Sequence, residues 1–410
     1  MTKKSDAPAI RFKGFSDAWE QRKLTEFVEF FSGLTYTPND VQENGTLVLR
    51  SSNVSNGEVV DADNIYVNPQ VVNSENVKVG DIVVVVRNGS RSLIGKHAQI
   101  KAFMPNTVIG AFMTGIRSEC PEFTNALLNT SRFEEEIAMN MGATINQITG
   151  YMFSKMEFKV PCLDEQKKIG EYFEKLDNLI TLHQRKFEKL TNVKKSMLEK
   201  MFPQNGSSYP EIRFKGFTDP WEQRKLSEMC GTFEYGLNAA AKEFDGKNKY
   251  IRITDIDDAS REFLLSDLSS PDICLDGMSK YLLSSGDIVF ARTGASVGKT
   301  YIYRENDGIV YFAGFLIRAK VNQDNDAEFV FQSTLSPSYE KYIRITSQRS
   351  GQPGVNAQEY GEYDLFAPSK EEQQRIGHFL RGIDHLITLH QRELEKLQNI
   401  KKSMLEKMFV

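Results

Sequence analysis

The chain contains one long internal repeat, which limits its fold more than any other feature. Residues 10–24 read IRFKGFSDAWEQRKL, and residues 212–226 read IRFKGFTDPWEQRKL. The segment KKSMLEKMF stands at residues 194–202 and again, unchanged, at residues 401–409. Self-similarity at a nearly constant offset predicts two copies of one structural unit.

The middles of the two copies have diverged while their ends have not. Residues 77–89 (VKVGDIVVVVRNG) and 282–294 (LLSSGDIVFARTG) share a skeleton but few identical residues. Drift after a gene duplication would change the ends as much as the middles. The pattern therefore indicates ends with one shared task and middles with two different tasks. Recent recombination between the copies is the rival explanation.

The composition is that of a globular protein. The chain is 40% hydrophobic and 26% charged, which is typical of folded globular proteins, and its length of 410 residues predicts about two to four domains. No apolar run approaches the roughly 18 residues that span a bilayer, and the start lacks the apolar core of a secretory signal. We expect a cytoplasmic protein with no membrane segment. Cys120, Cys162, Cys230 and Cys274 stand singly, so we expect no metal site.

The net charge of −4 weighs against a protein that binds DNA alone, because phosphate contacts need local positive charge. A basic face within an acidic average would answer this objection. A partner subunit that makes part of the phosphate contacts would answer it equally well. The sequence leaves both explanations open.

Two segments have apolar residues at spacings of three and four, the pattern of a coiled-coil helix. They start near Glu165 and Glu372, and each predicts a helix of about 36 residues, roughly 55 Å long. Pro161 and Pro368 end the preceding strands, and Ser369 with Glu372 has the spacing of a capping box. The residues of the predicted seam that recur every seven positions are Ile169, Leu176, His183, Leu190, Met197, Ile376, Ile383, His390, Leu397 and Met404, and the three-and-four spacing also assigns Leu179 and Leu386 to the seam.

Each long helix has an apolar stripe that needs cover, and the two stripes most simply bury each other. If a pseudo-two-fold axis relates the copies, the helices pair antiparallel, the variable regions lie at opposite ends, and helix length fixes their separation. His183 and His390 fall near the helix midpoints and would meet near that axis. We interpret them as packed histidines rather than as metal ligands.

These patterns predict an α/β (α+β) fold in which two variable domains are joined by two long helices. The first domain covers residues 1–161 and its helix residues 162–203. A linker follows at residues 204–211, and the second domain and helix cover residues 212–368 and 369–410. Strand-like runs lie at 81–86, 287–290 and 301–303, and helical stretches lie at 123–139 and 328–345.

The segment GASVGKT, residues 294–300, is similar to a phosphate-binding loop. A P-loop has four residues between its first glycine and its Gly-Lys pair, and a helix follows. Here three residues intervene, and the following YIYR is strand-like. The matching segment of the first copy, residues 89–97, has five intervening residues and ends in His97. A hairpin loop is therefore favoured over a nucleotide site.

As hairpin loops, these segments carry side chains that can read DNA. Arg binds guanine through two hydrogen bonds, Asn binds adenine, and Ser, Thr and Lys contact bases or phosphates. Similar residues occur in the loops 141–150 and 347–358, and at 50–53 and 252–255. A solvated turn or a strand end is the alternative in each case. The predicted DNA contacts are Ser52, Asn53, Arg87, Asn88, Ser90, Arg91, Lys96, Thr144, Asn146, Arg252, Thr254, Arg292, Thr293, Ser296, Lys299, Arg349 and Gln352.

No catalytic motif is evident in the sequence. An adenine methyltransferase would carry an Asn/Asp-Pro-Pro-aromatic motif, which does not occur. A nuclease carboxylate cluster and a supported Ser-His-Asp arrangement are also missing. The sequence predicts a non-enzymatic protein that selects a site on which other proteins act.

Over nearly its full length the chain resembles the specificity subunits of type I restriction–modification systems. The resemblance rests on the paired WEQRKL segments, the GDIVFARTGASVGK stretch, the P-x-x-x-E-Q openings at Pro161 and Pro368, and the repeated KKSMLEKMF. It implies that each variable segment is a target recognition domain for one half of a split site in double-stranded DNA. It also implies an antiparallel helical spacer. The longer loop of the first copy departs from the RTG-x-x-x-G pattern, so its contact residues are less defined.

The resemblance also implies partners: two adenine methyltransferase subunits and two translocase–nuclease subunits. These partners would bind S-adenosylmethionine, ATP and magnesium, so we expect no cofactor in this chain. Two other classes stay open. A scaffold that joins two protein-binding domains would show no DNA sequence preference, and an enzyme with nucleotide at residues 294–300 would lose ATP-dependent activity on Lys299→Ala. The half-site sequences do not follow from residue types, because readout depends on loop geometry and DNA shape.

Overall fold

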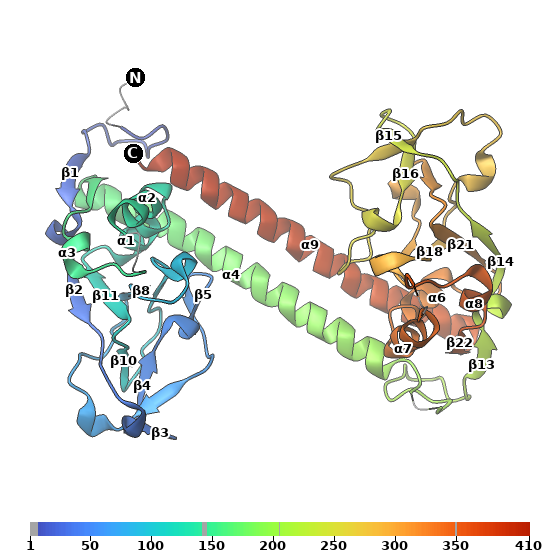
Figure 1. The fold of residues 1–410 in the computed structure, drawn as a ribbon, viewed down its shortest axis with the longest axis horizontal. Coiled ribbons are helices and arrows are strands. Elements are labelled where there is room, and N and C mark those ends of the chain that lie inside the picture. Colours follow the sequence, from blue (N-terminus) through green and yellow to red (C-terminus); the bar gives the residue numbers. More distant parts are fainter. Residues whose placement is uncertain (1–6, 142–145, 205, 349–350) are drawn as a thin grey trace. The chain divides into compact units, whose positions relative to one another are not determined.

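The structure, a computed structural model, describes residues 7–141, 146–204, 206–348 and 351–410. The chain divides into two compact units (Figure 1). Unit 1 comprises Met1–Leu182 together with Glu393–Val410, and unit 2 comprises His183–Arg392. The long helices α4 (Leu163–Lys200) and α9 (Lys370–Met408) each have one part in unit 1 and the other part in unit 2.

Unit 1 is built around the buried strand β8 (Ile82–Val85). Side chains of a strand alternate between its two faces. Ile82 and Val84 pack with the helices, whereas Val83 and Val85 pack with a second group of strands. This explains the continuous apolar run, because both faces of β8 are covered. The other elements are β1 (Glu20–Lys23), β2 (Val28–Ser32), β3 (Val41–Gln42), β4 (Thr46–Leu49), β5 (Val54–Ser55), β6 (Glu58–Val59), β7 (Ile65–Val67), β9 (His97–Gln99), β10 (Thr107–Ile109), β11 (Met113–Ser118), β12 (Glu157–Val160), α1 (Pro121–Leu128), α2 (Ser131–Asn140) and α3 (Gly150–Phe153).

The strands of unit 1 form a mixed set of sheets. The central sheet is antiparallel, in the order β2-β11-β8-β9. A second sheet, in the order β10-β4-β7-β3, contains the parallel pair β10–β4. This combination of antiparallel and parallel strands with helices confirms the predicted α/β (α+β) class.

Unit 2 repeats the same plan. Its central sheet has the order β14-β21-β18-β19, and its parallel pair is β16–β20. Ile288 and Phe290 of the central strand pack with the helices, and Val289 and Ala291 pack on the other face. The elements are β13 (Glu222–Lys225), α5 (Leu226–Met229), β14 (Cys230–Tyr235), β15 (Ala241–Glu243), β16 (Lys249–Ile251), β17 (Ser269–Pro271), β18 (Asp287–Ala291), β19 (Thr300–Ile302), β20 (Val310–Phe312), β21 (Leu316–Val321), α6 (Ala327–Ser333), α7 (Pro337–Thr346), α8 (Ala357–Gly361) and β22 (Asp364–Ala367).

The helical stretches predicted at 123–139 and 328–345 are each a pair of short helices, α1 with α2 and α6 with α7. In unit 1 the break falls at Thr130, whose hydroxyl caps α2 by accepting a hydrogen bond from the N–H of Phe133. In unit 2 the break falls at Ser336, which caps α7 in the same way, with Pro337 as the first helical residue. A capping hydroxyl starts a new helix more readily than it continues an old one.

The repeated N-terminal segments are bound to the starts of the long helices. Arg11 makes two hydrogen bonds to the buried carboxylate of Glu165, at 2.7 and 2.8 Å. Arg213 makes the same pair with Glu372. Both glutamates are almost fully buried, so their charge needs these guanidinium partners. The predicted capping box of Ser369 and Glu372 is therefore wrong, because the Glu372 carboxylate binds Arg213 instead.

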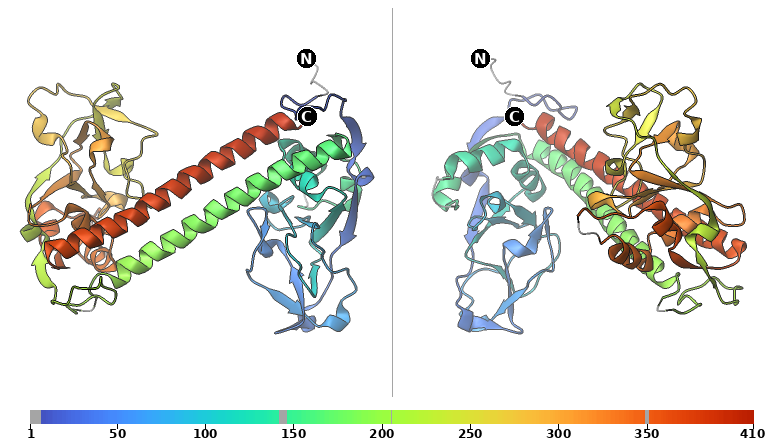
Figure 2. Two further views of the ribbon diagram at one scale, coloured as in Figure 1. Left: turned by 180° about the vertical axis from the view of Figure 1, so that it is seen from behind. Right: turned by 45° about the vertical axis from the view of Figure 1, so that its right-hand side comes forward.

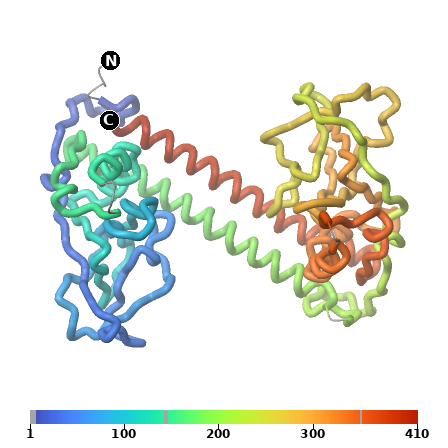
Figure 3. The backbone as a smooth tube through the Cα atoms, in the orientation of Figure 1, coloured from blue at the N-terminus to red at the C-terminus, as the bar shows by residue number. Residues whose placement is uncertain are grey.

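The repeated KKSMLEKMF segments explain why both ends of each copy are so similar. Phe409, at the end of the second copy, packs in unit 1 against Trp19 and Phe123. Phe202, at the end of the first copy, packs in unit 2 against Trp221 and Phe329. The N–H of Ile10 also donates to the carbonyl of Lys407, so the end of α9 lies beside the first described residues (Figure 3). Each unit therefore needs the helix end supplied by the other copy.

Within each unit, the parts of helices α4 and α9 that belong to it lie side by side (Figure 2). In unit 2, His183 contacts His390 and Lys194 pairs with Asp384, so the residue numbers run in opposite directions. In unit 1, Asp177 pairs with Lys401 at 2.6 Å. The pairing within each unit is antiparallel, as predicted.

The seam is narrower than the full apolar pattern suggested. All ten residues of the predicted seam, which recur every seven positions, are buried or half-buried. Leu179 and Leu386, which share the three-and-four spacing, are 44% and 43% exposed, so their assignment to the seam is wrong. If the ten residues are d positions of the heptad, the second core row follows four positions later, as buried Phe173 follows Ile169, and Leu179 and Leu386 are g positions at the edge of the seam.

Candidate nucleic-acid interface

The shared Gly-Asp-Ile motif is a structural turn, not a contact site. Gly80 and Gly286 have positive φ angles of 94° and 82°, which favour glycine. Asp81 accepts a hydrogen bond from the N–H of Lys78 and binds Arg117 of β11 through two further bonds. These bonds raise the pKa of the Arg117 guanidinium. The turn directs the chain into β8 or β18 and places the loop after that strand.

In unit 1 the loop after β8 presents Arg87 on an aromatic side chain. The N–H groups of Val86 and Arg87 both donate to the carbonyl of Phe112. The Arg87 guanidinium lies over the Phe112 ring, 5.0 Å from its centroid. Phe112 is 56% exposed although it is a large apolar residue. Stacking on a ring limits the orientations of an exposed guanidinium group. Its N–H groups can then donate hydrogen bonds to a ligand in a fixed direction.

In unit 2 the loop after β18 presents Arg292 between two aromatic rings. Its guanidinium lies 5.1 Å from the Tyr235 ring centroid and 5.7 Å from that of Phe315. Arg292 also lines a hollow of about 600 Å³ together with Arg252 and Thr254. The structure thus brings together three of the predicted contact residues, which come from segments about 40 positions apart.

The two arginines are not at equivalent backbone positions. Gly95 donates to the carbonyl of Val85 as Gly298 donates to that of Ala291, so Val86, one residue further on, corresponds to Arg292. Arg87 therefore corresponds to Thr293. Both guanidinium groups nevertheless lie over the equivalent phenylalanine. The two units build a similar stack with different surroundings.

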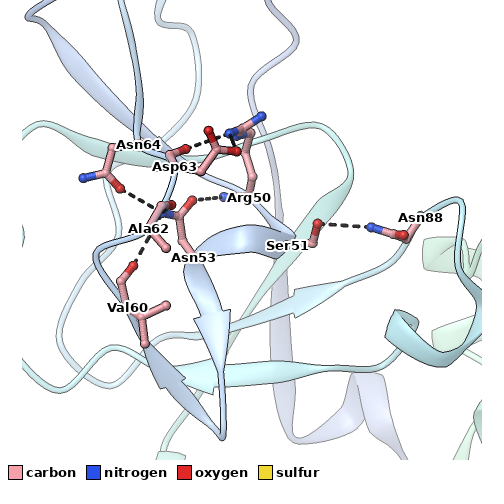
Figure 4. Close-up of polar contacts among 8 residues, drawn as sticks. All are labelled: Arg50, Ser51, Asn53, Val60, Ala62, Asp63, Asn64 and Asn88. Carbon is pink, nitrogen blue, oxygen red and sulfur yellow. Dashed lines mark hydrogen bonds and ion pairs between the residues drawn. The ribbon is translucent and has the colours of Figure 1, made fainter. Parts of the chain in front are cut away.

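Predicted contact residues of unit 1 lie in a short 3-10 turn at Ser51–Asn53 (Figure 4), and those of unit 2 lie in or beside a 3-10 turn at Ile253–Asp255. Asn53 is 1% exposed, accepts a hydrogen bond from the N–H of Arg50, and donates to Ala62 and Asn64. Its amide is therefore occupied within the protein, and we leave it out of the proposed contacts. Ser52 is exposed, and Asn88 donates to Ser51 across the gap between the two loops.

Arg252 has a partly structural role. Its guanidinium makes two hydrogen bonds of 2.8 Å to Asp255, which raise its pKa, and Asp255 also accepts from the N–H of Arg252. The hydroxyl of Thr254 donates to the same carboxylate. The Arg252 side chain remains one-third exposed, with its position fixed.

In each copy, the predicted contact loop before the long helix (141–150 or 347–358) lies against the loop that carries the stacked arginine. Arg87 forms an isolated bridge with Gln147, and Thr293 forms one with Gly354. Asn146 donates to the carbonyl of Gly89, and Gln352 is exposed beside Gly294. Thr144 and Arg349 lie outside the described residues.

The remaining predicted residues follow the stacked arginines in the loops after β8 and β18. Ser90 and Arg91 are exposed, and Lys96 and Lys299 are half-buried. Lys299 pairs with Asp258. Ser296 is 9% exposed, so it offers little surface to a ligand.

Sequence reasoning missed the aromatic members of both stacks, Phe112, Phe315 and Tyr235. A signal for two of them was present, since IGAFMTG at 109–115 and FAGFLIR at 312–318 place a phenylalanine at the same point before β11 and β21. In the sequence these phenylalanines look like core residues of an apolar stretch. In the structure both are 56% exposed, so they lie on the surface.

The segment 294–300 does not form a phosphate-binding loop. It makes a 3-10 turn at Gly294–Ser296 and runs into β19, as predicted from its strand-like sequence. A Cβ on Gly298 would lie 2.5 Å from Ile343, so this glycine serves close packing. In the described part of the chain, no three His, Cys, Asp or Glu side chains gather as a metal site. None of the described helices is long and apolar enough to cross a membrane.

Two units of one plan, each with an arginine stacked on an aromatic ring, define a class of protein with two similar but unlike candidate interfaces. Comparison with known proteins identifies the family. Residues 16–192 and 218–399 match the type I restriction modification DNA specificity domain, and the chain belongs to that family. As a member, it is the non-catalytic component that provides DNA specificity.

Comparison with individual specificity subunits agrees with this assignment. The chain is 22% identical over 415 residues to the StySPI specificity subunit of Salmonella potsdam, covering 96% of this chain and 89% of that protein. It is 22% identical over 416 residues to the EcoKI specificity subunit of Escherichia coli K12, with the same coverage. It is 25% identical to the MjaVIII specificity subunit of Methanocaldococcus jannaschii, over 64% of each chain. The crystal structure of the S subunit from M. genitalium has the same fold, with a TM-score of 0.66, 16% identity, and coverage of 98% of this chain and 99% of that one.

Proposed function

We propose that unit 1 and unit 2 each read one half of a bipartite site in double-stranded DNA. The observation that carries this proposal is the arginine–phenylalanine stack, which occurs in both units in different surroundings. A stacked arginine can donate two hydrogen bonds to guanine in the major groove, and different neighbours would select different bases around it. The proposed contacts are Ser52, Arg87, Asn88, Ser90, Arg91, Lys96, Asn146, Arg252, Thr254, Arg292, Thr293, Lys299 and Gln352.

The family supports a proposal about partners. We propose that two adenine methyltransferase subunits bind this chain in the cytoplasm and that two translocase–nuclease subunits complete a restriction complex. S-adenosylmethionine, ATP and magnesium would then belong to those partners. The net charge of −4 supports shared DNA binding, because the chain as a whole lacks the positive charge that non-specific DNA binding needs.

The paired helices would set the distance between the two half-sites. Inserting seven residues after His183 and seven after His390 keeps the heptad phase and lengthens both helices by about 10 Å. We expect the methylated motif to keep both halves and to gain about three base pairs between them. A motif with altered halves and an unchanged spacing would contradict this role.

Exchange of one variable segment tests the proposed function. The N–H of Leu24 donates to the carbonyl of Met156, and the N–H of Leu226 donates to that of Tyr363, so residues 25–156 and 227–363 are bounded by equivalent contacts. Replacing residues 25–156 with those of a relative should change one half of the methylated motif and leave the other half unchanged. Methylome sequencing reads both halves at once. An unchanged motif would refute the proposal, and a scaffold would give no motif at all.

A further inference from the structure

A second hollow in unit 2 has an unusual concentration of positive charge. It has a volume of about 630 Å³ and lies among α4, the turn at residues 257–262, the loop at residues 294–300 and α7. Five basic side chains line it, against two acidic ones. The basic residues are Lys194, Lys195, Arg261, Lys299 and Arg344, and the acidic residues are Asp258 and Glu340.

Part of this charge is already neutralised within the protein. Lys299 pairs with Asp258, and Lys194 pairs with Asp384 of α9. Within the described chain, Lys195, Arg261 and Arg344 have neither an ion pair nor a side-chain hydrogen bond, although Asp257 lies within electrostatic range of Arg261. Three cations therefore remain available to a negatively charged ligand.

Arg261 is held in the hollow at a conformational cost. It is a non-glycine residue with a φ of +58°, in the left-handed region. The turn that imposes this angle is closed by two backbone bonds, from the N–H of Arg261 to Asp257 and from the N–H of Asp257 to Glu262. The Nη1 atom of Arg261 is buried and has no hydrogen-bond partner among the described residues. A strained residue with an unpaired buried donor points to a ligand that completes its bonding.

The hollow adjoins the candidate nucleic-acid interface. The loop that begins at Arg292 ends at Lys299, so one loop contributes to both places. Ser347 lines the charged hollow, and its carbonyl accepts a hydrogen bond from Gly354, which bridges Thr293. A ligand that extends along this loop would reach both.

We propose that this hollow binds a backbone phosphate of the DNA duplex that unit 2 reads. Arg261 and Arg344 would donate hydrogen bonds to phosphate oxygens, and Lys195 would add charge. The inference rests on the proposed function and adds to it a contact that fixes position without reading sequence.

The first copy lacks an equivalent of Arg344. Gly95 approaches Ile137 as Gly298 approaches Ile343, so Arg344, the residue after Ile343, corresponds to Ala138. The phosphate contact is therefore a property of unit 2, and its loss should not alter how unit 1 binds.

The test uses the chain in complex with its methyltransferase partner. DNA affinity is measured over a series of salt concentrations for duplexes with and without the methylated motif. The variants are Arg261→Gly, Arg344→Ala and Lys195→Ala. Arg261→Gly suits the positive φ, so it should unfold at close to the wild-type temperature. Lys341→Ala is the matched control, because Lys341 is exposed on α7 and does not line the hollow.

We expect each hollow variant to lower the affinity for both duplexes by a similar factor, about three- to tenfold. The methylated motif should stay the same. The slope of log affinity against log salt should fall by about 0.9 for each lost contact, and Lys341→Ala should keep the wild-type slope. Hollow variants with the slope of the Lys341→Ala control would overturn the inference.

Two further outcomes separate the alternatives. Calorimetric titration of the DNA-free complex with ATP and with inorganic phosphate tests a free anion as ligand. Suppose that ATP or phosphate binds, that Arg261→Gly abolishes this binding, and that the same variant leaves the salt slope of DNA affinity unchanged. The hollow would then be a small-molecule site, and the inference would be overturned. A wild-type complex that does not prefer its motif would instead refute the proposed function.

Discussion

At the scale of single residues, the proposed recognition of DNA depends on where an arginine is held rather than on its position in an alignment. Arg87 and Arg292 differ by one backbone position, yet both guanidinium groups lie over the equivalent phenylalanine. The ring restricts the arginine, while the backbone shift changes its neighbours. This offers a simple route by which duplicated units acquire different specificities.

The two phenylalanines give a matched pair of variants. Phe315→Ala removes one ring that holds Arg292, so we expect about tenfold weaker discrimination at the half-site read by unit 2. Phe112→Ala should have the same effect at the other half-site only. Competition binding with duplexes that carry base changes in a single half measures both. Equal effects of each variant on both halves would contradict the assignment.

His97 gives unit 1 a predicted pH dependence. It is buried, its Nδ1 lies 3.0 Å from the carbonyl of Gly95, and its Nε2 accepts a bond from the Asn129 amide, which also donates to Asn125. Burial lowers the pKa of His97. Since protonation is disfavoured in the folded state, stability should be full above the ordinary histidine pKa and should fall as the pH drops below it.

The measurement follows unit 1 through Trp19, in a Trp221→Phe background, because each unit contains one of the two tryptophans. The free energy of unfolding should fall between about pH 7.5 and pH 5.5. In His97→Thr, which copies the equivalent Thr300, this contribution to the pH dependence should disappear. An identical pH profile in the two proteins would exclude His97 as its source.

How much of the site could be read from the sequence depends on the residue. The loops with Arg87 and Arg292 were predicted as contacts because their residue types suit DNA and differ between copies, and this stays a prediction. Asn53 was misleading, because burial, not residue type, gives it a structural role. Arg261 could not be found, since its strained φ and unpaired Nη1 arise from a turn that has no clear sequence signal.

At the scale of elements, the repeated ends belong to the cores of the units. Periodicity was sufficient to predict α4 and α9, because a long heptad pattern has few alternative structures. Periodicity could not show that Phe202 of the first copy packs in unit 2, or that Phe409 of the second copy packs in unit 1, since both depend on tertiary packing. It also placed Leu179 and Leu386 in the seam, where exposure shows that they are not.

This exchange of helix ends makes a prediction about stability. Phe409→Ala should destabilise unit 1, although Phe409 belongs to the second copy, because it removes contacts with Trp19 and Phe123. Phe202→Ala should destabilise unit 2 by about 3 kcal/mol. Denaturant unfolding followed by Trp19 alone and by Trp221 alone separates the two. The account fails at this point if Phe409→Ala shifts only the Trp221 transition.

At the scale of the whole molecule, the chain combines two recognition units of one plan with helices that both units share. Unit 1 is not a continuous stretch of sequence, since it needs residues 393–410, and unit 2, residues 183–392, lies between the two parts of unit 1 in the chain. A single cut through the chain therefore does not separate the two. The variable segments, in contrast, begin and end at equivalent backbone contacts and are suited to exchange.

A chain with two copies of one variable segment tests the central claim most directly. Residues 25–156 are replaced by residues 227–363, and the methylome is sequenced in cells that also express the methyltransferase partner. If each unit reads one half-site independently, the methylated motif should contain the half-site of unit 2 twice. A motif that keeps the original half-site of unit 1, or one in which the half-site of unit 2 also changes, would contradict the account.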